Sequence, residues 1–203
     1  MVEGSEIPVR IARHQLGTAL SLFIRNKDPL SVQALACGGS EVIERIAQKA
    51  GITTISTHLI GTTSFPDVKA LRKERNIYWN AIKHYTRTDR TDPDRDDEKV
   101  MAGFTDKAND VVLFLGWWDY LAITKRLPVE AQVFQAWWYG VNDKAMYPGE
   151  MREKVRMLFP NIMADDRAQQ KRRLNRMIEK HRHNEEVLSD ERTEVGTLVP
   201  SDW

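Results

Sequence analysis

Residues 104–126 read FTDKANDVVLFLGWWDYLAITKR, and this stretch decides the fold class. Apolar side chains lie almost all round the helix that it would form, so we expect a helix at the centre of the molecule. Apolar residues recur at helical spacing on both sides of it, which predicts further helices at about 7–25, 28–50, 66–87, 128–145, 149–159 and 165–184. The sequence therefore predicts an all-α fold, a single helical bundle of about six to seven helices.

The length and charge of the chain limit its domain organisation and its partners. The 203 residues are enough for one domain with its own core. We assign residues 1–160 to the helical bundle and residues 161–203 to a basic helix followed by a mobile tail. Thirty basic residues against 29 acidic ones leave a net charge of +1, so no overall field would attract nucleic acid or a membrane. A single cysteine and the lack of a long apolar run predict a cytoplasmic protein without a membrane span.

Polar side chains on the predicted helix 66–87 form a candidate binding site. Arg75 falls in the middle of the apolar face of this helix. Four more polar residues follow one border of that face: Asn76, Asn80, Lys83 and His84. Together they could line a pocket for an anionic group, with charge from the arginine and lysine and directional hydrogen bonds from the others. Histidine is a residue type suited to acid–base chemistry, which makes His84 a candidate, although a histidine at a helix end also commonly stabilises the helix dipole.

Arg75 also has a purely structural interpretation. An arginine at a core position needs a carboxylate partner, because an uncompensated buried charge is strongly destabilising. The two candidate partners are Asp110 and Asp119 on the central helix. We include both among the candidate binding residues. Stacking of Arg75 on Trp79 or Tyr78 is a third alternative. In each case we expect the site to lie where helix 66–87 meets helix 104–126.

The acidic run 89–98 has only part of a metal-binding pattern. Asp92, Asp94 and Asp96 have the spacing of a calcium loop, but Asp97 replaces the glycine at the sixth position and Gly103 the glutamate at the twelfth. Weak binding of a divalent ion by this run stays open. We assign no metal site and no cofactor, because no zinc, di-iron or phosphate-loop pattern occurs either.

Two further features bear on partners. The helix within 171–183 is strongly basic, which is typical of contacts with a nucleic-acid backbone, but its narrow apolar stripe also fits docking on the body or on another protein. Aromatic residues on the predicted helix 128–145 could form the interface of a homodimer if they are exposed.

Three groups of residues resemble a family of bacterial helical proteins that has no assigned activity. They are ARHQL and ALSLF at 12–16 and 19–23, DPLSV and LA at 28–32 and 35–36, and NAIKH and DRTDPD at 80–84 and 89–94. The resemblance covers about residues 10–145 and implies the same all-α fold.

A more distant resemblance is to HEPN-like helical domains, some of which are ribonucleases of toxin and defence systems. Their motif is an arginine, often followed by asparagine, and a histidine that is separated from the arginine by four to six residues; here eight residues separate Arg75 from His84. The resemblance implies that Arg75 and His84 would be catalytic, assisted by Asn76 and Asn80. The sequence thus predicts a helical binding or interaction module without an evident catalytic apparatus, with a HEPN-like ribonuclease as the alternative.

Overall fold

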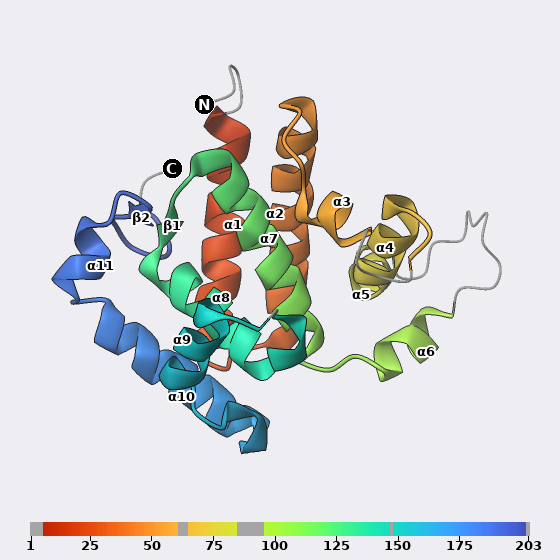
Figure 1. The fold of residues 1–203 in the computed structure, drawn as a ribbon. Helices are drawn as coiled ribbons and strands as arrows, with labels where there is room; N and C mark the ends of the chain where they lie inside the picture. Colours follow the sequence, from red (N-terminus) through yellow and green to blue (C-terminus); the bar gives the residue numbers. More distant parts are fainter. Residues whose placement is uncertain (1–5, 61–64, 85–95, 147, 202–203) are drawn as a thin grey trace.

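The computed structural model describes residues 6–60, 65–84, 96–146 and 148–201, and it confirms the all-α fold. The described part contains eleven α-helices, two short 3-10 helices and one pair of two-residue strands (Figure 1). Their number exceeds the predicted six to seven for two reasons. The helix that we expected at 66–87 is divided in two, and three short helices (Ile55–Ile60, Asp97–Ala102 and Glu185–Ser189) lie where we expected none. No helix in these ranges is long and apolar enough to cross a membrane.

Three long helices stand side by side at the centre: α1 (Glu6–Ile24), α2 (Pro29–Lys49) and α7 (Ala108–Thr124) (Figure 1). As predicted, α7 is buried almost all round, and its Trp117 is fully inaccessible to solvent. Small residues let the three helices approach closely at Leu16. A Cβ atom added at Gly39 would lie 2.9 Å from Leu16 Cγ, and one at Gly116 would lie 2.6 Å from Leu16 Cδ2. The side chain of Leu16 therefore fills a notch made by two glycines.

A second group of helices lies against the lower part of this layer. It comprises α8 (Val129–Val141), α9 (Glu150–Leu158) and α10 (Arg167–His181), with the 3-10 helices η1 (Asp143–Ala145) and η2 (Ile162–Ala164) between them (Figure 1). Leu174 and Ile178 of α10 are fully buried in the same core as α1 and α7. The boundary that we placed at residue 160 therefore does not separate two cores.

The aromatic residues of α8 point mostly inward. Phe134 and Trp137 are fully buried, and the ring of Trp138 stacks on Phe114 with 3.8 Å between the centroids. None of the large apolar side chains that are exposed in the described residues belongs to α8. The exposed aromatic surface that we expected on this helix is thus largely used for packing.

Four short helices form an arm beside the central layer: α3 (Ile55–Ile60), α4 (Val68–Arg75), α5 (Ile77–Lys83) and α6 (Asp97–Ala102) (Figure 1). Asp67 caps α4 by accepting a hydrogen bond from the Ala70 amide at 2.7 Å. The predicted continuous helix 66–87 is wrong, since Asn76 has φ −95° and ψ 11° and divides it into α4 and α5. A further helix, α3, lies between the helices that we predicted at 28–50 and 66–87.

The C-terminal segment packs on the molecule instead of forming the mobile tail that we predicted. After α11 (Glu185–Ser189), the strand β2 (Thr193–Glu194) pairs in parallel with β1 (Leu127–Pro128). The guanidinium group of Arg13, which is buried on α1, holds the segment: it donates to the Glu194 carboxylate at 2.7 Å and to the Leu198 carbonyl at 2.5 Å. A buried guanidinium group needs hydrogen-bond acceptors, and the C-terminal segment supplies them.

Candidate binding site

The predicted Arg75 site is a buried ion-pair cluster. The Arg75 side chain is only 3% exposed, and its Nη2 lies 3.0 Å from Oε2 of Glu44 on α2. The other two guanidinium nitrogens are also engaged, since Nη1 donates to Ser56 Oγ at 3.3 Å and Nε to Asn76 Oδ1 at 3.0 Å. Arg75 therefore forms a structural ion pair, as one of our alternatives proposed, but its partner is Glu44 and neither Asp110 nor Asp119.

Glu44 binds a second arginine as well. Arg72 donates from Nε and Nη2 to Glu44 Oε1, both at 3.1 Å. Burial alone would raise the pKa of Glu44, but the charge of Arg75 and the hydrogen bonds from Arg72 hold it below its usual value. We call Arg72, Arg75 and Glu44 the arginine cluster. It ties the arm to α2 and leaves Arg75 little capacity to bind a ligand.

The two aspartates of α7 have other partners. Asp110 binds Arg167 of α10, with 2.5 Å between Oδ1 and Nη2. Asp119 Oδ1 accepts a hydrogen bond from the Ile55 amide at 2.7 Å, which fixes the start of α3. Oδ2 of Asp119 is buried and has no hydrogen-bond partner among the described residues. Burial raises the pKa of Asp119 to about 6.

Asn76 is bonded to Arg75, whereas Asn80, Lys83 and His84 lie on the next helix, α5, or at its end. Asn76 donates from Nδ2 to Glu41 Oε1 at 3.2 Å, and the Lys83 ammonium group lies 5.7 Å from the centre of the Trp79 ring. His84 ends α5, and its amide donates to the carbonyl of Asn80 at 3.0 Å. The break at Asn76 separates these residues of α5 from the guanidinium group at the end of α4. The sequence did not predict this division of the polar residues between two helices.

The acidic run 89–98 lies outside the described residues up to position 95. Asp96 caps α6 by accepting from the Lys99 amide at 3.0 Å. Within the described ranges, no group of three or more histidine, cysteine or acidic side chains could hold a metal ion.

The basic helix α10 has two different faces. The inner face is joined to the body by ion pairs: Lys171 Nζ lies 2.8 Å from Asp106, and Arg167 binds both Asp106 and Asp110. Near the C-terminal end of α10, Arg182 binds the buried carboxylate of Glu130 at 2.9 Å. These ion pairs agree with one of our alternatives for this helix, namely that it docks on the body of the protein.

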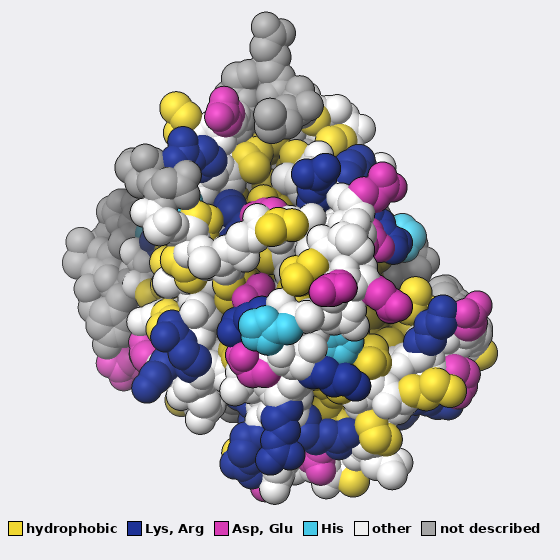
Figure 2. All heavy atoms as spheres, turned by 90° about the vertical axis from the view of Figure 1, so that its left-hand side faces the viewer, with side chains coloured by type: hydrophobic (Ala, Val, Ile, Leu, Met, Phe, Trp, Pro, Cys, Tyr) yellow, Lys and Arg dark blue, Asp and Glu magenta, His cyan; other side chains and the backbone are white. Residues whose placement is uncertain are grey.

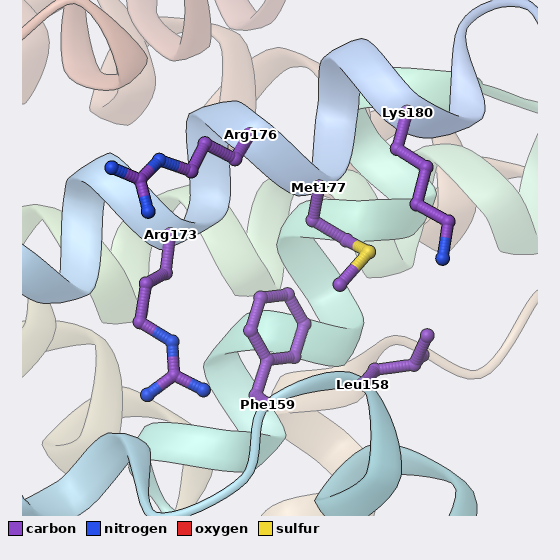
Figure 3. Close-up of a pocket in the computed structure, with 6 residues that line it drawn as sticks. All are labelled: Leu158, Phe159, Arg173, Arg176, Met177 and Lys180. Atoms are coloured by element: carbon purple, nitrogen blue, oxygen red, sulfur yellow. The ribbon is translucent and has the colours of Figure 1, made fainter.

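The outer face of α10 forms a pocket with the end of α9. The pocket has a volume of about 230 Å³ and is lined by Leu158, Phe159, Arg173, Arg176, Met177 and Lys180. Met177 and Phe159 point toward one another across it, with Arg173 on one side and Lys180 and Leu158 on the other (Figure 3). The pocket therefore combines an apolar floor with a basic rim.

The cations of this rim differ in how they are held. Arg173 is fixed, because it donates to Asp165 Oδ2 at 2.6 Å and to the Pro160 carbonyl at 2.7 Å. Arg176 and Lys180 are exposed and have no carboxylate partner in the described part of the chain. We call these two residues the rim cations. Lys and Arg side chains gather low on the face of Figure 2, the level at which Figure 1 places α10.

The sequence pointed to this region only in part. The basic character of 171–183 was visible, but the pocket was missed, because Leu158 and Phe159 come from another helix. The Leu158–Phe159 pair at the end of a predicted helix was the one feature of the sequence that could have indicated an apolar surface here. Its place beside α10 follows only from the tertiary structure.

No family model, curated protein or solved structure matches the chain. The site must therefore be interpreted from its own chemistry.

Proposed function

We propose that this chain is a binding module that recognises an anionic group at the pocket between α9 and α10. The observation that supports this proposal is the contrast on α10 itself. Arg167, Lys171 and Arg182 each bind a carboxylate of the body. The rim cations have no such partner in the described ranges and stand beside an apolar hollow. Cations next to a pocket favour binding of an anion from outside the molecule.

The same contacts argue against using Arg75 for catalysis. A HEPN-like ribonuclease would need the Arg75 guanidinium group on the substrate phosphate. All three of its nitrogens already donate to Glu44, Ser56 and Asn76, so the contact would require a buried ion pair to break. We therefore favour binding without catalysis, in line with the interaction module that the sequence predicts. The free, buried Cys37 also supports a cytoplasmic location.

The test is binding of a fluorescein-labelled oligo-glutamate peptide, followed by fluorescence anisotropy at low salt. We expect the double variant Arg176→Glu/Lys180→Glu to bind the probe about tenfold more weakly, because two favourable charge contacts become repulsive. Arg172→Glu is the matched control, since Arg172 is exposed on the same helix but does not line the pocket. An equal loss of affinity in the control and the double variant would overturn the assignment of the site to this pocket.

A further inference from the structure

We infer that the natural partner is an acidic protein segment that inserts one apolar side chain into the α9–α10 pocket. This inference rests on the proposed anion-binding function and adds the class of partner. We favour a protein segment over a nucleic acid, because the floor of the pocket is apolar and exposed methionines lie near it in the chain.

The floor of the pocket selects for an apolar group. Leu158, Phe159 and Met177 present carbon and sulfur atoms, and Phe159 and Met177 face each other across the hollow (Figure 3). Pockets that enclose whole drug-sized ligands have volumes of about 300–1,000 Å³. A volume of about 230 Å³ is smaller and suits a single inserted side chain. Methionine adapts its shape easily, so Met177 can close around aliphatic residues of different shape.

The rim supplies the charge complementarity. Arg176 and Lys180 are four residues apart on α10 and therefore lie on the same side of the helix, one turn from each other. Acidic residues on both sides of an inserted apolar side chain would meet these two cations. Because the whole chain has a net charge of only +1, this attraction is local and depends on the rim itself.

Two exposed methionines lie close in the chain to the pocket residues Leu158 and Phe159. Met157, just before Leu158, is 79% exposed, and Met163, four residues after Phe159, is 62% exposed. Exposed methionines are common on surfaces that bind other proteins. A protein segment could cover them, whereas a sugar–phosphate backbone would gain little from them.

Nucleic acid fits this surface less well. Proteins that bind single strands combine basic grooves with exposed aromatic rings on which bases stack. Phe159 is the only aromatic residue among the six that line the pocket, and it is 2% exposed. The pocket therefore offers a single ring and no series of rings on which successive bases could stack.

The experiment compares three labelled probes at physiological salt by fluorescence anisotropy with the full chain. The first probe is an acidic peptide with one central leucine, the second is the same peptide with alanine in place of leucine, and the third is an oligo-uridine. We expect the leucine peptide to bind about tenfold more tightly than the alanine peptide, because burial of an aliphatic side chain stabilises the complex. We expect the oligo-uridine to bind more weakly than both.

Two variants separate the contributions of floor and rim. Met177→Gln makes the floor polar at a half-buried position, so it should remove the preference for leucine and keep the binding of the alanine peptide. Arg176→Glu/Lys180→Glu should weaken both peptides, and Arg172→Glu should change neither by more than about twofold.

The outcomes distinguish this inference from the function on which it rests. If both peptides bind equally and lose affinity in the rim variant, the anion site stands and the protein-segment inference fails. Tighter binding of the oligo-uridine than of either peptide would also overturn it, in favour of nucleic acid. If no probe depends on the rim cations, the proposed function fails as well.

Discussion

Two pairs of cations, one on α4 and one on α10, look alike in the sequence and differ in their surroundings. Arg72 and Arg75 share the carboxylate of Glu44, whose side chain is 5% exposed. Arg176 and Lys180 stand in solvent beside an apolar hollow. The sequence drew attention to Arg75 of the first pair, because an arginine on an apolar face is conspicuous. The binding function that we propose uses the second pair, which lines a pocket and has no carboxylate partner in the described residues.

This comparison distinguishes charges that stabilise the fold from charges that can bind a ligand. A buried cation with a buried acceptor holds two elements together, and its loss should be measured as a loss of stability. An exposed cation at a pocket contributes little to folding, and its loss should be measured as a loss of affinity. The following substitutions test this distinction through the free energy of unfolding.

Substitution of Arg75 by alanine should produce the largest loss of stability. We expect the free energy of unfolding to fall by about 3–5 kcal/mol, because Glu44 is left with only one of its two arginines. Urea denaturation followed by circular dichroism measures this change. The double variant Glu44→Gln/Arg75→Met is the control, and it should recover part of the loss by removing both charges together. A loss below about 1 kcal/mol for Arg75→Ala would show that the cluster does not hold the arm.

Substitution of Arg13 by alanine tests a second buried arginine, the one that binds the C-terminal segment. We expect a loss of about 3 kcal/mol, since Arg13 donates to the Glu194 carboxylate and to the carbonyls of Thr197 and Leu198. Hydrogen exchange should show faster exchange at residues 193–198 than in the unchanged protein. Glu194→Gln retains an acceptor for Arg13 and should cause a smaller loss. Unchanged exchange in the Arg13 variant would mean that other contacts secure the segment.

Asp119 should make stability depend on pH. Its folded-state pKa is raised from 3.8 to about 6 by burial, so the folded state binds a proton more tightly than the unfolded state. The contribution of Asp119 to stability is therefore complete below about pH 4 and is lost as the pH rises through about 6.

Asp119→Asn should remove this dependence. We expect the variant to be more stable than the unchanged protein by about 2 kcal/mol at pH 8, since each pKa unit corresponds to about 1.4 kcal/mol and the amide loses part of that gain. The two proteins should converge near pH 4. Thermal denaturation at the two pH values measures the difference, and a gain that is the same at both would rule out titration of Asp119 as its cause.

Arg176→Glu/Lys180→Glu should have the smallest effect on folding. Both side chains are exposed, so we expect the free energy of unfolding to change by no more than about 0.5 kcal/mol. The same urea denaturation as for Arg75→Ala makes the two pairs directly comparable. A loss of several kcal/mol would place the rim cations with the structural charges and would remove the basis for a binding site there.

The sequence predicted the fold class well, because the apolar stretch 104–126 can form only a buried helix in a chain of this composition. The start of α2 was predictable too, since Asp28 caps it and Pro29 suits its first turn. The break at Asn76 was not, because the propensities of its neighbours permit a continuous helix and the packing of the arm on α2 decides otherwise.

The site was less predictable than the fold. Glu44 is one of two acidic residues on α2, beside Glu41, and nothing in its sequence spacing marks it as the partner of Arg75. The C-terminal segment is polar and ends the chain, which is typical of a mobile tail, yet the buried guanidinium group of Arg13 holds it. Pairings between residues so far apart in the chain depend on the tertiary arrangement and leave no local pattern.

The most direct test of the account compares the two regions in one measurement. The ¹⁵N-labelled protein is titrated with the acidic leucine peptide, and the chemical shifts of the backbone amides are followed. We expect the largest chemical-shift changes at residues 157–159 and 173–180, around the pocket, and only small changes at residues 72–84. Changes centred on 72–84, with the amides of α10 unaffected, would contradict this expectation and return the binding site to the arm.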